Sequence, residues 1–332
     1  MLAAAQRSVE WNGTTLRVGA SAGCAHSQAD QSLQQTLINA DLALYRAKSE
    51  GRNRLVDFAP SLAREANERA VLGEELRKAL EQGDFEPHFQ PQFMAGSRAL
   101  RGAEALARWS HPELGVISPA VFLSIAEEQK LAVELDRLIM RKAVETAQRW
   151  REIGVSPPKL SVNVSAKTLK SKSLIDDLSS LDDAMRRSLS IEVLETVFIS
   201  AEDDSLRWTR ETLGEMGVTV ELDDFGTGHA SVASILAIRP DFLKLDRIFS
   251  KDVAIDASKL AVTTSLLGVA DSVDIPVIAE GVENQCDAQV LEQAGCYALQ
   301  GFFFGEPLPE ASFAERHLRA KIEGALEAAD EN

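Results

Sequence analysis

Two adjacent carboxylates, Asp223 and Asp224, are the residues whose types and spacing most directly indicate chemistry. They end the run Val218–Asp224, whose β-branched residues predict a strand, and a glycine-rich turn up to Gly228 follows. Adjacent ionised carboxylates repel each other, so a fold that keeps them must offset their charge. A divalent metal is the usual offset, and oxygen ligands suit Mg²⁺ or Mn²⁺. An isolated Asp-Asp pair is also common in turns and helix caps, so the rest of the chain must decide.

The elements that would position this pair alternate between strands and helices from Phe85 onward. Amphipathic stretches such as Leu131–Ile153 and Ala257–Val273 separate most of the predicted strands. The eight predicted strands are His88–Phe93, Arg101–Trp109, Leu160–Ser165, Leu189–Glu195, Val218–Asp224, Phe242–Asp246, Ile275–Val282 and Tyr297–Phe302. This alternation predicts an α/β fold, a (β/α)₈ TIM-like barrel with its active site at the carboxyl ends of the strands. Only Met94–Ala99 joins the first two strands, so we expect the first strand to be antiparallel.

The chain divides into segments of different character. Residues 1–58 contain a predicted strand at Thr15–Gly23 and a predicted helix at Leu33–Lys48 that Gly51 ends, too little for an independent core. This segment is interpreted as a small α/β remnant of a larger domain. Residues 59–82 predict a connecting helix, residues 83–315 the barrel, and residues 316–332 a C-terminal helix or tail.

Composition argues against several classes of protein. The chain has 332 residues, of which 45% are hydrophobic, and its net charge of −16 argues against non-specific binding to nucleic acid or membrane surfaces. The cysteines Cys24, Cys286 and Cys296 share no metal-binding spacing and are interpreted as ordinary reduced thiols. No apolar run approaches the ~18 residues that span a bilayer, and the first residues lack the apolar core of a signal peptide. We expect a cytoplasmic protein, or the cytoplasmic part of a longer, membrane-anchored one.

Polar residues interrupt the predicted strands near the ends where a barrel places its active site. They are Glu104, Asn163, Glu192, Asp223, Asp224, Lys244, Glu280 and Gln300. Any one of them could be a satisfied core residue, but their recurrence on successive strands predicts an oxygen-lined site for cations.

The acidic residues could hold two metal ions, the usual device for hydrolysing phosphodiesters. Glu104, Asn163, Glu192 and Asp223 could serve one ion, and Asp223 could bridge to a second ion held by Asp224 and Glu280. Bound cations would also let an acidic site hold an anionic substrate. Lys244 has two interpretations, a group that orients the attacking water or a buried ion pair with a neighbouring acid.

Several separate motifs resemble the signature of EAL domains, a bacterial family that hydrolyses cyclic di-GMP. They are Glu104-Ala-Leu106, Asn163-Val-Ser165, Asp223-Asp-Phe-Gly-Thr-Gly228, Lys244-Leu-Asp246, Glu280-Gly-Val-Glu283 and Gln300-Gly301, in order over about residues 70–310. The resemblance implies hydrolysis to linear pGpG with two Mg²⁺ or Mn²⁺ ions per site. It implies metal ligands at Glu104, Asn163, Glu192, Asp223, Asp224 and Glu280. Among the catalytic residues it implies Glu104, Asp224, Lys244 and Glu280.

The same resemblance implies roles outside the metal site. Substrate-binding positions are Gln90, Leu106, Arg108, Asp246 and Gln300. Glu195 matches the acid that holds the loop after the fifth strand, and a homodimer through the barrel is implied. In the first segment, Val18–Gly23 and Ala40–Asn53 resemble the C-terminal end of a GGDEF (diguanylate cyclase) domain. Because the nucleotide-binding half and the signature loop are absent, we expect no cyclase activity.

The chain departs from the EAL pattern at three positions, none of them a metal ligand. Leu194 stands where Thr is usual, Phe89 replaces a common Tyr, and His229 lies in the loop after Gly228 and is interpreted as a surface residue. Two alternatives to an enzyme follow. One is a cyclic di-GMP receptor that binds without cleaving, which Leu194 favours. The other is an interaction module that dimerises through the first segment and the connecting helix.

Overall fold

The computed structural model describes residues 8–12, 14–27, 31–195, 204–228, 235–236 and 238–318. The chain forms two compact units, Met1–Lys78 and Ala79–Asn332, called unit 1 and unit 2 below. The division falls inside helix α3 (Pro60–Gln82), which coincides with the predicted connecting helix. Of the predicted C-terminal helix or tail, residues 319–332 lie outside the described part. None of the helices among the described residues combines the length and the apolar character needed to cross a bilayer.

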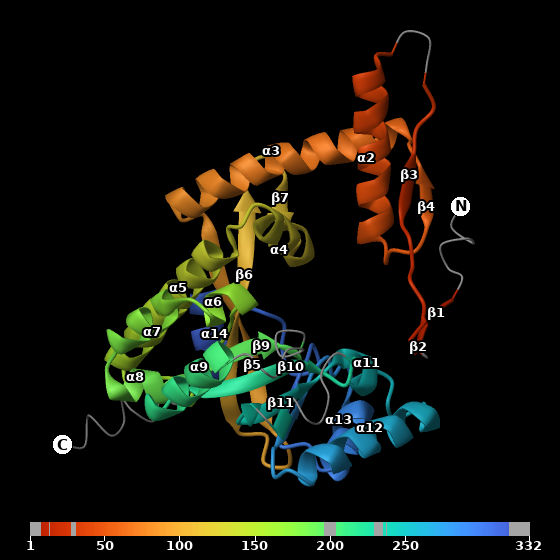
Figure 1. The fold of residues 1–332 in the computed structure, drawn as a ribbon. Helices are drawn as coiled ribbons and strands as arrows, with labels where there is room; N and C mark the ends of the chain where they lie inside the picture. Colours follow the sequence, from red (N-terminus) through yellow and green to blue (C-terminus); the bar gives the residue numbers. More distant parts are fainter. Residues whose placement is uncertain are drawn as a thin grey trace, which may run out of the picture. The chain divides into compact units, whose positions relative to one another are not determined.

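Unit 2 contains a closed barrel, visible as the bundle of strands between two groups of helices (Figure 1). Eight strands follow one another around it in the order β5-β13-β12-β11-β10-β9-β8-β6, and β6 pairs with β5 to close the ring. The strands are β5 (Phe85–Met94), β6 (Leu100–His111), β8 (Leu160–Asn163), β9 (Leu189–Leu194), β10 (Thr219–Phe225), β11 (Phe242–Leu245), β12 (Val277–Ala279) and β13 (Ala298–Gln300). The predicted barrel and its eight strands are confirmed. A short strand, β7 (Gly115–Ile117), pairs with β6 outside the ring and was not predicted.

Strand β5 runs antiparallel to both of its neighbours, while the other barrel strands pair in parallel. The prediction of an antiparallel first strand is therefore confirmed. Phe85, the first residue of β5, lies opposite Trp109 near the carboxyl end of β6. Lys142 fastens this entry point, because its ammonium group donates to the carbonyls of Gly83 and Phe85 at 2.6 and 2.7 Å.

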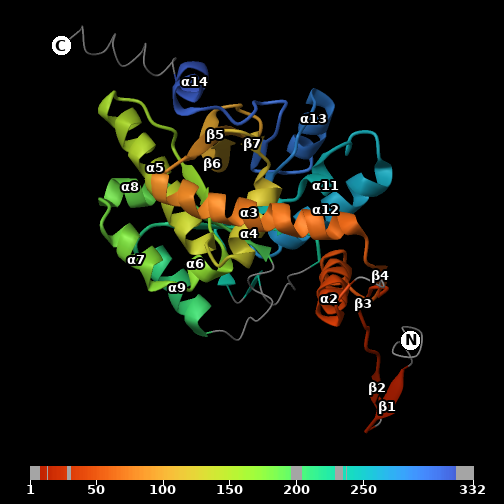
Figure 2. The ribbon, with the colours of Figure 1, turned by 90° about the horizontal axis from the view of Figure 1, so that it is seen from above.

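Helices cover the barrel on two flanks, as both views show (Figure 1 and Figure 2). On one flank lie α5 (Ala132–Glu152), α7 (Lys172–Ser179), α8 (Asp183–Ser188) and α9 (Asp204–Glu215), and on the other α12 (Ala257–Asp271) and α13 (Gln285–Gln293). The remaining helices are α4 (Pro119–Glu128), α6 (Ala166–Leu169), α11 (Arg247–Ser250), α14 (Glu310–Phe313) and the π-helix η2 (Ala314–Leu318).

Alternation along β5 sends neighbouring side chains to opposite sides of the strand. Phe89 packs on Trp150 of α5, with ring centroids 4.9 Å apart, and on Phe313 of α14 at 5.9 Å. Gln90 instead bonds to the side chain of Gln300 and to the carbonyl of Gly305. A tyrosine hydroxyl at position 89 would therefore point into this apolar layer, so the replacement of the family's Tyr by Phe89 does not strip the site of a polar group.

Unit 1 contains a parallel pair, β3 (Ala22–Cys24) and β4 (Leu55–Asp57), beside helix α2 (Leu33–Ser49). The hydroxyl of Ser32 caps the start of α2 by accepting from the Gln35 amide at 3.2 Å, so the predicted helix is confirmed. A separate hairpin, β1 (Val9–Trp11) and β2 (Thr14–Leu16), extends away from this pair (Figure 2). The single strand predicted at Thr15–Gly23 is wrong, because β2 and β3 are distinct strands that pair with different partners.

Candidate active site

Four carboxylates meet around one buried lysine in the barrel of unit 2. The Nζ atom of Lys244 lies 2.5 Å from Oε2 of Glu192, 2.6 Å from Oε1 of Glu280 and 3.2 Å from Oε2 of Glu104. The nearest oxygen of Asp223 is 4.0 Å away. These residues come from β6, β9, β10, β11 and the position after β12. The convergence that the sequence predicts is therefore present in the fold.

Amide side chains hold Glu104 in place from the remaining strands. Asn163 donates to Oε1 of Glu104 at 2.6 Å, and Gln300 donates to Oε2 at 2.6 Å. Gln300 also donates to Gln90 at 3.1 Å, and Gln90 donates to the carbonyl of Gly305 at 3.1 Å. Predicted ligands and predicted substrate-binding residues thus form one hydrogen-bonded network.

A β-bulge explains how two neighbouring residues of one strand can both serve the site. Between Leu222 and Phe225 the register of β10 against β11 shifts, which leaves one extra residue on β10. Asp224 adopts a left-handed backbone with φ of 58°, and its amide donates to Oδ1 of Asp223 at 2.9 Å. The bulge breaks the strand's alternation, so Asp223 faces Lys244 while Asp224 lies beside Asp246.

Glycine follows two of the site residues because neighbouring backbone or side-chain atoms leave no room for a Cβ. A Cβ on Gly281, where φ is 64°, would lie 2.3 Å from Cβ of Arg247. A Cβ on Gly301 would lie 2.2 Å from the backbone N and O of Val282. The Glu-Gly and Gln-Gly pairs of the sequence therefore seat Glu280 and Gln300 where the neighbouring chain runs closest.

Burial shifts the proton equilibria of the cluster. Burial raises the pKa of Glu280 to about 8, although the positive charge of Lys244 opposes this shift. Burial, together with the negative charge of Glu104, raises the pKa of Glu192 well above its usual range. The pKa of Asp224 rises to about 6 through burial and the charge of Asp223. Burial alone would lower the pKa of Lys244, but the surrounding carboxylates outweigh it and the pKa rises. Lys244 therefore stays protonated.

The donor set fits divalent cations. Oε1 of Glu192 is buried and has no hydrogen-bond partner among the described residues. One lysine faces four carboxylates, so negative charge remains in excess when they ionise. Carboxylate and amide oxygens are the donors that Mg²⁺ and Mn²⁺ prefer.

A cavity of about 410 Å³ opens beside the cluster. Glu104, Asn163 and Asp223 line it together with the predicted substrate-binding residues Leu106 and Arg108. Burial lowers the pKa of Arg108, although the charge of Glu104 opposes this effect. A guanidinium beside an open cavity can contact two oxygens of an anion at once.

The other predicted residues have different structural positions. Asp246 caps α11 by accepting from the Ile248 amide at 2.7 Å. Glu195 is buried and accepts from the Thr227 hydroxyl at 3.1 Å, which ties β9 to the turn after β10. Leu194 also lines the cavity and is 46% exposed. His229 lies outside the described residues.

Sequence reasoning misses a buried polar layer next to the amide network. Arg101 donates to Oε1 of Gln92 and, at 2.6 Å, to Oε1 of Glu221. Gln92 donates to Gln300 at 2.9 Å, which connects this layer to Glu104. The register of β5 against β6 shifts at Gln92, which leaves Arg101 as the extra residue of a bulge. A period-2 pattern does not reveal Arg101, because the bulge turns it inward.

A second missed residue is Asp136 of α5, which also lines the cavity. It accepts from the Ser165 amide at 2.7 Å and from the Thr168 hydroxyl at 2.6 Å. Burial raises its pKa despite these donors. The only signal in the sequence is a lone acid in an amphipathic helix, which is usually a solvated position.

Comparison with known proteins identifies the family. The sequence profile described as EAL domain matches residues 73–307, a stretch that contains the whole cluster. The chain belongs to the EAL domain family. The EAL barrel resembles the solved structure of the PaMucR phosphodiesterase in its c-di-GMP complex, with a TM-score of 0.66 and 31% identity. That match covers 72% of this chain and 98% of the other.

Two curated relatives extend the comparison beyond the EAL barrel. The bifunctional diguanylate cyclase/cyclic di-GMP phosphodiesterase MucR of Pseudomonas aeruginosa is 34% identical over 300 residues, which is 89% of this chain and 43% of MucR. The cyclic di-GMP phosphodiesterase PdeR of Escherichia coli is 32% identical over 284 residues, or 85% of this chain and 42% of PdeR. The chain therefore spans less than half the length of these relatives.

Proposed function

We propose that the EAL barrel of this chain hydrolyses cyclic di-GMP to linear pGpG. The observation that carries the proposal is the cluster of Glu104, Glu192, Asp223 and Glu280 around Lys244. It lies in a barrel whose relative at 31% identity has been solved as a c-di-GMP complex. Retention of all the acidic positions disfavours the receptor alternative.

The metal content we propose is two divalent ions, Mg²⁺ or Mn²⁺. Glu104, Asn163, Glu192 and Asp223 would hold one ion, and Asp223, Asp224 and Glu280 the other. When bound, such ions polarise the phosphate and activate water for attack. The unpartnered Oε1 of Glu192 supports this assignment, since a bound cation would satisfy it.

The chain's own residues would then orient the substrate and the metal ligands and stabilise negative charge on the phosphate. Lys244 lies within 3.2 Å of oxygens of Glu104, Glu192 and Glu280, so we propose that it acts as a positive charge and hydrogen-bond donor beside the reacting groups. Gln300 and Asn163 hold the Glu104 carboxylate, and Gln300 in turn orients Gln90. Arg108 would contact phosphate oxygens from the cavity wall. We also propose that Asp246 and Leu106 contact the substrate. Glu195 is proposed to anchor the loop after the fifth barrel strand.

The deciding experiment identifies the product. The chain is incubated with cyclic di-GMP and Mn²⁺ or Mg²⁺, and the nucleotides are separated by chromatography. We expect linear pGpG, and we expect Glu104→Gln to lower the rate by on the order of 10³-fold. If the wild-type chain binds cyclic di-GMP by calorimetry yet leaves it intact with metal present, the chain is a receptor.

Calcium provides a second test of the metal assignment. Ca²⁺ prefers longer bonds and looser geometry than Mg²⁺. We therefore expect Ca²⁺ to bind and to compete with Mn²⁺ while supporting little turnover. Brisk hydrolysis in Ca²⁺ alone would contradict the proposal of two closely spaced Mg²⁺-type ions.

Leu194 is the departure that most favours a receptor, and its position lets the idea be tested. Its side chain is 46% exposed at the cavity and pairs in register with Asp223. Because Leu194 is about half exposed at the cavity, we expect Leu194→Thr to fold normally. We propose that it changes the rate by less than about tenfold. Activity that appears only in Leu194→Thr would show that the wild-type chain is a receptor.

The remaining assignments concern the larger protein. We propose that residues 1–58 are the C-terminal end of a GGDEF domain. The match to the bifunctional MucR supports this proposal, because it covers 89% of the chain and so extends beyond the EAL domain match. We further propose a cytoplasmic location, as a separate protein or as the cytoplasmic part of a membrane-anchored one. We also propose a homodimer through the barrel, and light scattering after gel filtration would test it.

A further inference from the structure

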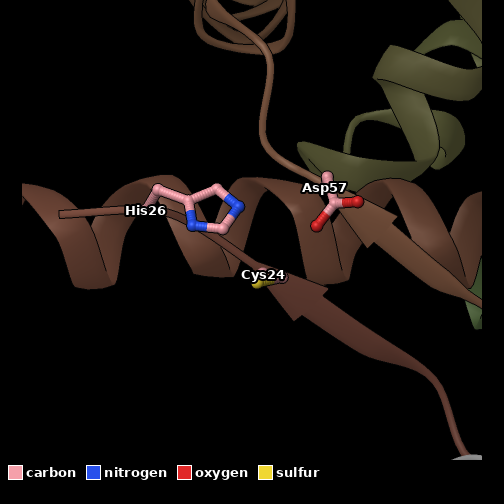
Figure 3. A group of neighbouring side chains, drawn as sticks. All are labelled: Cys24, His26 and Asp57. Atoms are coloured by element: carbon pink, nitrogen blue, oxygen red, sulfur yellow. The ribbon is translucent and has the colours of Figure 1, made fainter.

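Three potential metal ligands meet in unit 1, apart from the acidic cluster of unit 2. Cys24, His26 and Asp57 each offer one ligand atom, and these atoms all lie within 4.8 Å of one another. Figure 3 shows the imidazole of His26 and the carboxylate of Asp57 pointing toward one another near the thiol of Cys24. Among the described residues, no hydrogen bond or ion pair occupies these three side chains.

The backbone itself brings the three side chains to one face. Cys24 and Asp57 are register partners at the carboxyl ends of the parallel strands β3 and β4. Side chains of register partners point to the same side of a sheet. The Phe58 amide donates to the Cys24 carbonyl at 2.7 Å and fixes this pairing. His26 follows Cys24 at a spacing of two, which returns an extended chain to the same face.

The opposite face of the pair is already occupied by α2. A Cβ on Gly23 would lie 2.1 Å from the Ala40 carbonyl oxygen and 2.2 Å from the Leu44 amide nitrogen. Gly23 therefore packs directly against the helix, and Cys24, its neighbour in β3, faces away from it. The three ligands lie on the uncovered side, where His26 and Asp57 are exposed and Cys24 is half-buried.

The donor atoms distinguish this cluster from the acidic site. One sulfur, one nitrogen and one oxygen suit Zn²⁺, whereas a thiolate is a poor ligand for Mg²⁺ or Mn²⁺. Bonds to zinc of about 2.0–2.3 Å bring tetrahedral ligand atoms to about 3.3–3.6 Å from one another. Rotation of the exposed His26 and Asp57 side chains can make up the remaining distance.

Unit 1 also has a structural use for such an ion. Within the described part of residues 1–58, only Ala43 and Ala47 are buried hydrophobic residues. Small units with little core commonly gain stability from a bound metal. A cation here would join the ends of β3 and β4 and close the chain segment that contains α2.

We propose that Cys24, His26 and Asp57 form a three-ligand zinc site whose fourth position is open to solvent. The spacing of the cysteines in the sequence does not predict this site, because only one ligand is a cysteine and Asp57 comes from a different strand. This proposal departs from the interpretation of Cys24 as an ordinary thiol, and the experiment below decides between the two.

Cobalt substitution tests the proposal on the full chain. Co²⁺ takes up zinc sites and gives an intense near-ultraviolet charge-transfer band only when a thiolate is a ligand. With excess Mg²⁺ present to occupy the oxygen site, we expect this band in the wild-type chain and its loss on adding Zn²⁺. Cys24→Ser should abolish the band, while His26→Ala and Asp57→Asn should weaken cobalt binding by at least about tenfold.

Matched variants separate this site from other thiols. Cys286 is exposed and belongs to no such cluster in the described part of the chain, so Cys286→Ser should keep the full band. Circular dichroism should show that Cys24→Ser and Asp57→Asn, both close in shape to the native residues, remain folded. The absence of a band in the wild-type chain, its survival in Cys24→Ser, or its loss in Cys286→Ser would overturn the proposal.

Discussion

Lys244 balances the charge of the carboxylates that surround it. Its ammonium group is fully buried within 2.5–3.2 Å of three of them. A buried charge that loses its partner is much more costly than an exposed one. The stability of the metal-free barrel therefore depends on this lysine, whatever its role in the reaction.

Lys244→Met should lower the free energy of unfolding of the metal-free chain by about 3–5 kcal/mol. The matched control is Lys251→Met, which breaks an exposed pair with Glu283 and should change the free energy of unfolding far less than Lys244→Met does. Urea unfolding in the presence of a chelator gives both values. Equal losses in the two variants would show that the Lys244 pairs contribute no more than surface pairs.

The raised pKa values predict how metal-free stability depends on pH. Folded Glu280 keeps its proton up to a pKa of about 8, whereas the unfolded value is near 4.5. Between these values the folded state binds more protons than the unfolded state, so the free energy of unfolding falls as pH rises. Asp224 adds the same effect up to its pKa of about 6.

Because metals bind the deprotonated carboxylates, the increase in Tm on adding Mn²⁺ should grow from about pH 6 to about pH 8.5. Thermal melts with and without Mn²⁺ across this range measure it. Glu280→Gln removes one of these contributions and should make the fall of metal-free stability with pH shallower. A metal-free Tm that rises through the same range would contradict this assignment.

Among the elements, two β-bulges set the limit of what the sequence predicts. Short apolar or alternating runs between helical stretches predict the eight barrel strands, and the recurrence of polar residues near their carboxyl ends predicts that Glu104, Glu192 and Lys244 converge. It does not predict the extra residues at Asp224 and Arg101, because a bulge depends on pairing between strands rather than on either strand alone. The Asp223–Asp224 pair is predicted from residue type, whereas the Arg101 layer is not predicted.

Arg101→Met should destabilise the chain by about 3–5 kcal/mol, because it leaves Glu221 buried without a counter-charge. Combining it with Glu221→Leu should recover much of the loss. The exposed pair of Arg137 and Asp177 provides the control, and Arg137→Met should cost less than about 1 kcal/mol. Urea unfolding of the wild-type chain and these three variants measures the losses. A double variant no more stable than Arg101→Met would mean that the layer does not act as an ion pair.

At the scale of the whole molecule, the described residues of the proposed hydrolytic site all belong to unit 2. The family match begins at residue 73, and the solved PaMucR structure corresponds to little more than the barrel. A chain that starts at residue 73 should therefore fold and hydrolyse cyclic di-GMP at a rate within about tenfold of the full chain. Chromatography and circular dichroism measure this. A folded but inactive product would show that the first segment is needed for turnover.

The reversed strand β5 has a consequence for control from outside the barrel. In an all-parallel barrel the chain arrives at the amino ends of the strands, the rim remote from chemistry. Here Phe85 lies opposite Trp109, so the chain arrives at the rim that carries the cavity, and Lys142 clamps it there. A segment that precedes β5 is therefore joined to the barrel at the rim that carries the cavity. Loss of the Lys142 hydrogen bonds would therefore release the chain at this rim and not at the rim remote from chemistry.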